Sequence, residues 1–334
     1  MLFLFHSLIL YLSLTHSLFC AARQYPTTQL YQFPNGTFVE NLAVRPDGSI
    51  LLSFITSPDL YLLHPSSPNP TPHLLHRFTN ATSTLGITET SPDTFILAVT
   101  TILTAAQGLP GSSSLWRISF PFPKSTSPEI TLAARIPAVV TPNGLVTLNR
   151  RKILLADSAQ GLVFAVDLET GVSTVAIGAE EPLFANRGRP ISVNGLKIRG
   201  SRLYFTNTAL NLLGRVEIDR STGAARGLAE EVVEALPPGK GYGDLALGGG
   251  GVAYVTNAAG NFVERVDVRR RRQVVIAGEV NSTEIAEPTA VALGRGGEED
   301  VLFVTTGGGL LIPVNGGEIV GGQVVAIKLG RRYR

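Results

Sequence analysis

The stretch Asn194-Gly-Leu-Lys-Ile198, followed by Arg202-Leu-Tyr-Phe-Thr206 and Gly214-Arg-Val-Glu-Ile-Asp219, contains the pattern that decides the fold. Each segment is short and rich in alternating apolar residues. Turn-forming residues separate them, which is typical of antiparallel β-strands. The same pattern begins at Asn143, 51 residues earlier, and at Asp244, 50 residues later. A repeat of roughly 40–50 residues built from strands has the size of one β-propeller blade.

Working outward in both directions gives six copies between about residues 38 and 328. They begin near residues 41, 85, 143, 194, 244 and 289. We therefore predict an all-β chain that forms a single six-bladed β-propeller. The segment 24–33 is expected to supply an N-terminal strand that closes the ring with the sixth blade, because closure removes exposed sheet edges. A large β-sandwich is the alternative, but six copies have no natural place in it.

The N-terminal segment indicates a targeting sequence rather than a part of the fold. Residues 1–20 are predominantly apolar and are followed by Ala21 and Ala22. This pattern predicts a signal peptide at residues 1–22 and a propeller at residues 23–334. A signal anchor is the alternative, since about 20 apolar residues can span a bilayer. The single cysteine, Cys20, lies in this segment, so no intramolecular disulfide can form.

Three Asn-X-Ser/Thr sequons lie in polar or turn-like stretches, at Asn35, Asn80 and Asn281. They predict N-glycosylation and a protein of the secretory pathway, either secreted or held in a secretory or vacuolar lumen. After cleavage of the signal peptide no membrane association is expected.

Composition narrows the class of partner. The chain has 28 Lys and Arg against 26 Asp and Glu, a net charge of +2, so a nucleic-acid partner is not expected. The run Arg269–Arg272 is predicted to be a solvated hairpin turn. The run Gly248–Gly251 is not a phosphate-binding loop, and no organic cofactor is predicted. The expected partner is a small-molecule substrate, and the expected state is a monomer.

Residues at the start of the first strand of each blade are expected to meet at one mouth of the central channel. There the copies place Glu40, Asn143, Asn194 and Asp244. Carboxylate and amide oxygens suit a hard divalent cation such as Ca²⁺. Alternatively, the Asn-Gly pairs serve only as turns. The second and sixth copies offer weaker candidates, namely Thr88 or Glu89 and Thr289.

The chain resembles the SMP-30/gluconolactonase/luciferin-regenerating-enzyme family of six-bladed propellers over about residues 35–328. The most specific motifs are Val193-Asn194-Gly195-Leu196, Leu203-Tyr204-Phe205-Thr206-Asn207 and Gly243-Asp244-Leu245-Ala246. The resemblance implies that Glu40, Asn143, Asn194 and Asp244 hold one divalent cation. It also implies that Asp244 is the acid/base.

Two departures from this family pattern bear on the substrate. Thr141 stands where sugar-lactone members carry Arg, and Glu40 precedes Asn41-Leu42 rather than Gly-Pro. Loss of the Arg favours a more apolar ligand. The segment Phe33–Arg45 resembles the corresponding segment of secreted fungal members of this family that are encoded in natural-product gene clusters. Some of these are similar to hetero-Diels–Alderases that join a tropolone-derived quinone methide to a humulene-type sesquiterpene.

Other residues are predicted to contribute to the site. Tyr242 precedes Gly243-Asp244 and is a candidate catalytic residue. The loop before the fourth blade carries Phe184, Asn186 and Arg187, which together with Thr141 are candidate substrate contacts.

Three functions remain open from the sequence. The favoured one is a secreted fungal biosynthetic enzyme that catalyses an intermolecular hetero-Diels–Alder cyclisation of an apolar small molecule. The alternatives are a divalent-metal-dependent lactonase or esterase and a non-catalytic ligand-binding propeller.

Overall fold

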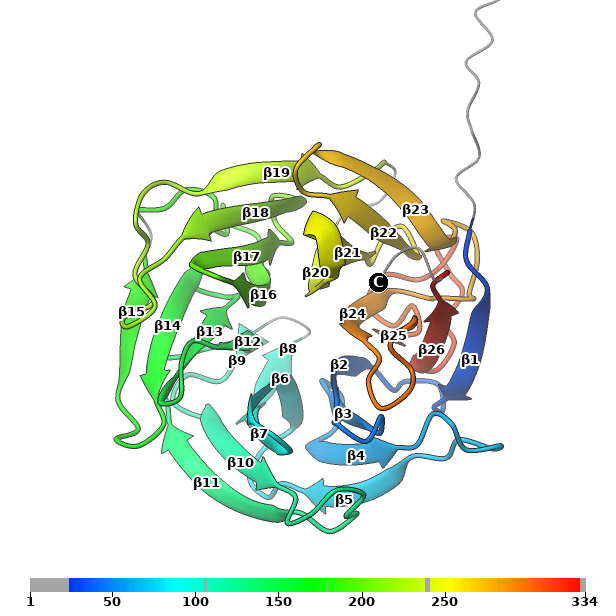
Figure 1. Ribbon diagram of the computed structural model, residues 1–334, viewed down its shortest axis with the longest axis horizontal. Coiled ribbons are helices and arrows are strands. Elements are labelled where there is room, and N and C mark those ends of the chain that lie inside the picture. Colours follow the sequence, from blue (N-terminus) through cyan, green and yellow to red (C-terminus); the bar gives the residue numbers. More distant parts are fainter. Residues whose placement is uncertain (1–23, 105–106, 179, 238–240, 331–334) are drawn as a thin grey trace, which may run out of the picture.

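The computed structural model describes residues 24–104, 107–178, 180–237 and 241–330. The predicted signal peptide lies outside these residues. Six four-stranded antiparallel sheets surround a central channel (Figure 1), which confirms the predicted all-β six-bladed propeller. Apart from one 3₁₀ turn at Gly249–Gly251, the described residues contain no helix. None of these segments could therefore cross a membrane as an apolar helix.

In each of the first three blades the strands follow one another from the channel outward in chain order. Blade 1 contains β2 (Val39–Val44), β3 (Ile50–Phe54), β4 (Asp59–Leu63) and β5 (His73–Arg77). Blade 2 contains β6 (Ser83–Ser91), β7 (Thr94–Thr100), β10 (Ser114–Ser119) and β11 (Glu129–Arg135). A small hairpin of β8 (Ile102–Thr104) and β9 (Gln107–Gly108) is inserted there. Blade 3 contains β12 (Pro142–Thr147), β13 (Lys152–Asp157), β14 (Leu162–Asp167) and β15 (Ser173–Ile177).

The remaining blades complete the ring. Blade 4 contains β16 (Val193–Arg199), β17 (Arg202–Asn207), β18 (Leu212–Glu217) and β19 (Glu230–Glu234). Blade 5 contains β20 (Tyr242–Leu247), β21 (Val252–Asn257), β22 (Phe262–Asp267) and β23 (Arg272–Gly278). Blade 6 contains β24 (Pro288–Leu293), β25 (Val301–Thr306), β26 (Gln323–Lys328) and the N-terminal strand β1 (Thr27–Gln32). Strand β1 pairs antiparallel with β26, as predicted, and closes the ring.

The hydrophobic core lies between blades rather than at the channel. Six clusters of buried residues each draw on two adjacent sheets, for example Leu154, Val163, Leu203 and Phe205 between blades 3 and 4. Because both faces of each blade are covered by the neighbouring blades, the second strands are mostly apolar. Their burial fixes the positions of the inner strands.

Each innermost strand is irregular near its start, where its pairing with the second strand skips one or two residues. The residues at this break include Glu40, Asn143, Asn194, Gly243 and Thr289. Neighbouring inner strands approach closely here: a Cβ on Gly86 would lie 1.8 Å from the Asn143 carbonyl oxygen. Glycine beside the break is therefore a packing requirement.

Hydroxyl groups in or just after the second strands donate hydrogen bonds to backbone carbonyls of the next blade, close to these irregular segments. Ser53 donates to Leu85 O at 2.6 Å, Ser158 donates to Val193 O at 2.6 Å, and Thr256 donates to Thr289 O at 3.0 Å. Thr289 in turn donates to Val39 O at 2.7 Å. These bonds tie the blades together where the irregular segments of different blades meet.

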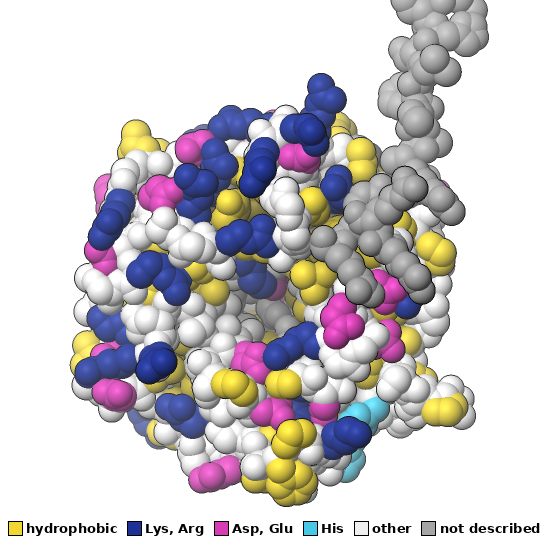
Figure 2. All heavy atoms as spheres, viewed as in Figure 1, with side chains coloured by type: hydrophobic (Ala, Val, Ile, Leu, Met, Phe, Trp, Pro, Cys, Tyr) yellow, Lys and Arg dark blue, Asp and Glu magenta, His cyan; other side chains and the backbone are white. Residues whose placement is uncertain are grey.

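The arginine run forms the turn between β22 and β23, as predicted. Backbone N–H groups of Arg269 and Arg270 donate to the Asp267 carboxylate, and the Arg271 guanidinium pairs with Glu230 at 3.1 Å. Figure 2 shows basic side chains spread over blades 4 and 5, interspersed with acidic ones, and a hollow at the centre of the ring. Exposed pairs of this kind contribute little to stability.

Candidate functional site

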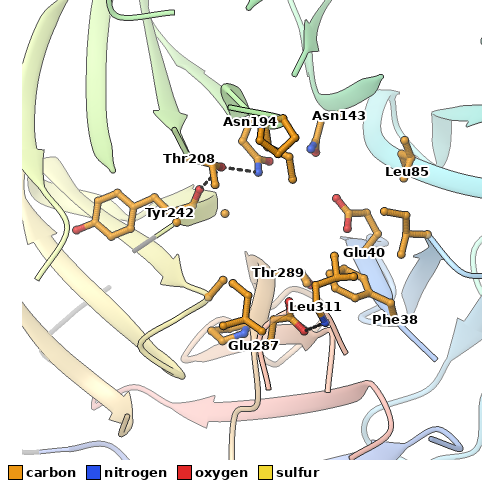
Figure 3. Close-up of a pocket in the computed structure, with 18 of the residues that line it drawn as sticks. Phe38, Glu40, Leu85, Asn143, Asn194, Thr208, Tyr242, Glu287, Thr289 and Leu311 are labelled. Atoms are coloured by element: carbon orange, nitrogen blue, oxygen red, sulfur yellow. Dashed lines mark hydrogen bonds between the residues drawn. The ribbon is translucent and has the colours of Figure 1, made fainter. Parts of the chain in front are cut away.

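A cavity of about 290 Å³ opens at the end of the channel where the irregular starts of the inner strands meet (Figure 3). Its volume is at the lower end of the roughly 300–1,000 Å³ typical of small-molecule sites. Most of its wall is apolar, from Phe38, Ile55, Leu85, Pro190, Ile191, Ala258, Pro288, Leu311 and Ile312. Polar side chains are few and come from Glu40, Thr141, Asn143, Asn194, Thr208, Glu287 and Thr289.

Glu40 extends from β2 into this cavity and is half-buried. Within the described residues, no side chain or backbone N–H donates a hydrogen bond to its carboxyl group. Burial, reinforced by the negative charges of Glu287 and Asp244, raises the pKa of Glu40 to about 7. At neutral pH a large fraction of this group is therefore a carboxylic acid that can donate a hydrogen bond to a ligand.

A second carboxyl group, Glu287, lies just before β24 and is 2% exposed. Burial raises its pKa to about 7, although backbone N–H groups of residues 309–312 favour the ionised form. The Leu311 N–H donates to Glu287 Oε2 at 3.1 Å. Glu287 thereby anchors the 307–322 loop, whose Leu311 and Ile312 side chains are about 40% exposed and line the cavity.

Two asparagines face this cavity from blades 3 and 4. Asn194 Nδ2 donates to Thr208 Oγ1 at 3.0 Å, and Thr208 donates to Tyr242 O at 2.7 Å. Asn143 is 5% exposed, and its Oδ1 is buried without a hydrogen-bond partner among the described residues. A buried oxygen without a partner is costly, and in this orientation the Asn143 oxygen has almost no surface exposed to the cavity.

Thr141 also lines the cavity, as predicted for a substrate contact. Its Oγ1 accepts a hydrogen bond from the Gly108 N–H at 3.0 Å, which couples it to the inserted hairpin of blade 2. Of the weaker candidates, Thr289 lines the cavity, whereas Thr88 and Glu89 lie at the C-terminal ends of the inner strands.

Asp244 is not among the residues that line this cavity. Its carboxylate instead faces a second cavity of about 260 Å³, formed by the C-terminal halves of the inner strands. Both carboxylate oxygens lie 2.8 Å from the Lys197 Nζ. The structure thus brings Glu40, Asn143 and Asn194 together, and it gives the fourth residue of the expected quartet an ammonium partner.

This arrangement does not fit a divalent cation held by all four residues, because the Asp244 carboxylate is already neutralised. Within the described ranges, no three His, Cys, Asp or Glu side chains cluster as a metal site. Glu40 and Asn143 carry oxygens of the type that a hard cation binds, but two such groups are far fewer than the roughly six to eight ligands that Ca²⁺ takes.

The structure corrects the expected role of Tyr242. Its side chain is fully buried and points away from the cavity (Figure 3), while its backbone forms part of the wall. The hydroxyl donates to Glu264 Oε2 at 2.6 Å, and burial and this carboxylate raise the pKa of Tyr242 well above its usual value. The Tyr242 side chain therefore cannot contact a ligand in the cavity, and it instead positions the start of β20.

Replacing Tyr242 by phenylalanine is therefore expected to lower stability rather than activity. The loss of one buried hydrogen bond that leaves Glu264 with fewer partners costs about 1–3 kcal/mol. We expect a lower midpoint of urea unfolding and a change in kcat of less than about three-fold. A hundred-fold fall in kcat in a folded Tyr242→Phe protein would contradict this assignment and show that the hydroxyl group takes part in the reaction.

The loop before blade 4 reaches the cavity through residues that sequence reasoning did not select. Phe184 is fully buried and stacks on Phe205 with ring centroids 4.0 Å apart, so it is not a substrate contact. Asn186 Nδ2 donates to Ala159 O at 2.8 Å, and Arg187 is exposed outside the cavity wall. The loop contributes Pro190 and Ile191 instead.

Glu287, Lys197 and the loop residue Leu311 are the functional candidates that the sequence pattern missed. Glu287 stands two residues before Thr289, the sixth-blade counterpart of the candidate ligands, so inspection of the residues preceding each inner strand would have found it. Lys197 follows Asn194 by three residues on β16. Nothing in the repeat pattern marks the long 307–322 loop as part of the site.

The fold and cavity define a six-bladed propeller with an apolar site at one mouth, and solved structures share this architecture. A luciferin-regenerating enzyme aligns with TM-score 0.65 and 12% identity over 93% of this chain and 97% of its own. Regucalcin of Agrobacterium tumefaciens, a calcium-binding protein, aligns with TM-score 0.58 and 17% identity over 92% and 96%. A protein provisionally named a gluconolactonase gives 0.58 and 15%, again over 92% and 96%. These likenesses confirm the fold.

Sequence relatives point to a narrower group. The chain is 27% identical over 220 residues to a Sarocladium schorii protein with the provisional name hetero-Diels-Alderase asR5, covering 58% of this chain and 54% of the relative. It is 25% identical over 317 residues to a Phoma sp. protein provisionally named a hetero-Diels-Alderase, covering 86% and 88%. The first match thus spans about half of that relative. No protein-family model matches the chain.

Proposed function

We propose that the protein catalyses an intermolecular hetero-Diels–Alder cyclisation between an electron-poor heterodiene and an apolar alkene. The observation that carries this proposal is an apolar cavity whose one unpartnered carboxyl group, Glu40, has a pKa raised to about 7. Weak homology to proteins named as hetero-Diels–Alderases supports it.

The proposed reaction requires the protein to orient the two reactants more than to supply reactive groups. Heterodiene and alkene form one C–O and one C–C bond. Three π bonds are consumed and one new π bond forms between the central heterodiene atoms. No electrons are gained or lost and no group leaves. Apolar walls formed by Phe38, Leu85, Ile191 and Leu311 would hold the two reactants in contact, and well-oriented pairs can gain about 7–11 kcal/mol of the barrier.

Glu40 would supply the polar part of catalysis. As a carboxylic acid it donates a hydrogen bond to the heterodiene carbonyl oxygen, which draws electron density from the diene and stabilises the charge that develops on this oxygen. The proton stays on Glu40 throughout.

A metal-dependent lactonase is the second candidate, favoured by the oxygen-rich set of Glu40, Asn143 and Asn194 at one cavity. The cation would polarise a carbonyl group. The ion pair between Lys197 and Asp244 counts against it, because the residue expected to activate water is already bound by an ammonium group.

The test combines a reactive o-quinone methide, generated in solution, with an excess of a sesquiterpene alkene. The protein should accelerate formation of the dihydropyran and give one enantiomer in excess by chiral chromatography, with and without EDTA. EDTA-sensitive hydrolysis of a lactone panel, with racemic cycloadduct, would support the lactonase instead. Binding without either turnover would support the non-catalytic propeller.

Filling the cavity should lower the rate of this reaction. The change Ile191→Trp enlarges a half-buried wall residue, and a misfit in an apolar pocket costs about 10–200-fold in kcat/KM. The matched control is Val175→Trp on the outer strand β15, where the side chain is 52% exposed. Equal rates for both variants would place the reaction outside this cavity.

We also infer a secreted, monomeric glycoprotein. In its support, Asn35, Asn80 and Asn281 are all exposed, as glycosylated asparagines must be. Endoglycosidase treatment of the protein from a eukaryotic host should increase its mobility on a denaturing gel, and substitution of each Asn by Gln should remove one step of the shift.

A further inference from the structure

We propose that Glu287 is a positioning residue that determines which apolar alkene the site accepts. Its carboxyl group holds the part of the 307–322 loop that carries Leu311 and Ile312, two residues of the cavity wall. This role rests on the proposed function and identifies the group that selects its second reactant. Glu287 acts through the loop and takes no part in the bond-forming step.

The backbone of Glu287 is held on both sides, so its carboxyl group has a defined place. Its N–H donates to Asn261 Oδ1 at 2.9 Å, and its carbonyl oxygen accepts a hydrogen bond from the Gly307 N–H at 2.8 Å. Glu287 has a φ of 56°, a left-handed conformation that is uncommon for a residue with a side chain. Such a conformation persists where the surrounding contacts enforce it, and it is often found at ligand sites.

The carboxyl group of Glu287 lies against the backbone of the loop. Its Oε2 accepts a hydrogen bond from the Leu311 N–H at 3.1 Å, and the N–H groups of residues 309–312 together favour its ionised form. Successive N–H groups of this kind form a site for an anion, and here the anion belongs to the chain itself. The approach is close, since a Cβ on Gly307 would lie 2.7 Å from Glu287 Oε2 and 2.3 Å from Phe38 Cε2. Because Glu287 is only 2% exposed, bulk water cannot replace these loop contacts.

Leu311 and Ile312 form an apolar rim on the cavity. Both line it, yet they are 40% and 38% exposed, so a ligand would cover apolar surface that otherwise faces water. Figure 3 shows Leu311 beside Glu287 and across the cavity from Asn194. An alkene hydrocarbon carries no polar atom and binds through apolar contact, whereas Glu40 binds the heterodiene carbonyl in the proposed reaction. The rim therefore sets how large an alkene fits, and Glu287 sets where the rim lies.

Hydrogen exchange followed by mass spectrometry tests whether Glu287 holds the loop. In Glu287→Ala the peptide that contains residues 309–312 should exchange about ten-fold faster than in wild type, because hydrogen bonds to a charged group are lost. Glu318→Ala is the matched control, since Glu318 is an exposed carboxyl residue of the same loop, and its exchange should be unchanged. From the loop side, Gly307→Ala should reproduce the effect. Gly317→Ala should not, because a Cβ on Gly317 would meet no described atom within 4 Å.

Alkene affinity tests whether this placement selects the substrate. A sesquiterpene alkene should displace the fluorescent probe N-phenyl-1-naphthylamine from the wild-type protein, and Glu287→Ala should require about ten-fold more alkene. In the cyclisation assay this variant should raise KM for the alkene by a similar factor, and KM for the heterodiene by less than about three-fold. Glu287→Gln keeps one acceptor oxygen and should lie between the two proteins. It also serves in place of the alanine variant if that protein does not fold.

Two results would overturn this role. One is loop exchange in folded Glu287→Ala that matches wild type. The other is faster exchange with no loss of alkene affinity, which would leave Glu287 a purely structural residue. The probe assay needs no turnover, so a protein that binds the alkene in a Glu287-dependent way but forms no cycloadduct would refute the proposed function alone. A wild-type protein that does not bind the alkene would refute both.

Discussion

Replacing Glu40 by alanine is expected to lower kcat/KM for the cyclisation by about 10²–10³-fold, the usual cost of removing one donor to a developing oxyanion. Glu40 is the carboxyl group that extends into the apolar cavity without a hydrogen-bond donor among the described residues. Its loss removes the donor but leaves the walls that hold the reactants. Alanine at the exposed Glu231, on the outer strand β19, is the control and should change the rate less than two-fold.

The pH dependence distinguishes donation by Glu40 from a packing effect. The pKa of Glu40 is raised to about 7, so the donating acid predominates below this pH and the carboxylate above it. The rate should therefore be highest on the acid side and fall as pH rises through about 7. Glu40→Gln keeps an N–H donor of similar size, and its rate should be partly retained and independent of pH.

Two outcomes would contradict this role. A Glu40→Ala protein with unchanged kcat/KM would show that orientation alone accelerates the reaction. A rate that rises with pH through 7 would make the ionised carboxylate the active form, as a base rather than a donor. Neither result would affect the assignment of the cavity itself, which Ile191→Trp tests separately.

The fold was predictable because each repeat contains strands in which apolar residues alternate with polar ones, and turn-forming residues separate these strands. The spacings of 51 and 50 residues locate the inner strands of blades 3 to 5 within a residue or two of β12, β16 and β20. The closing strand was predictable for a related reason: an apolar-polar segment before the first blade must pair with an otherwise open edge.

The site was less predictable. The spacing of the repeats shows which residues occupy equivalent positions in their blades, but it does not show where each side chain points. Asn143 and Asn194 line the cavity, yet the Asp244 carboxylate turns to Lys197 on the neighbouring strand. Tyr242 and Phe184 were selected for being near the mouth in sequence, and both are core residues. Aromatic side chains gain more by burial than by exposure at a mouth, so proximity in sequence was a poor guide.

Loss of the Asp93 carboxylate should destabilise the fold more than loss of the Tyr242 hydroxyl. The Arg45 guanidinium is fully buried between blades 1 and 2 and makes paired bonds to Asp93, from Nε at 2.8 Å and Nη2 at 2.9 Å. It also donates to Ser125 O at 2.9 Å and stacks over the Phe120 ring at 3.6 Å. Asp93→Ala would leave a buried charge without its main partner, which costs about 3–5 kcal/mol.

Urea unfolding followed by the fluorescence of Trp116, the only tryptophan, reports on this prediction because Trp116 lies in blade 2 on β10. The exposed pair Arg151–Asp167 is the control: Arg151→Met should cost less than about 1 kcal/mol, since its side chain is 50% exposed. The double change Arg45→Met with Asp93→Ala should cost less than the sum of its parts, because the Arg45 and Asp93 charges are then removed together, although Asp47 loses its 3.5 Å contact with Arg45. Additive losses would mean that Arg45 stabilises the blade seam by its contacts with Phe120 and Ser125 rather than through Asp93.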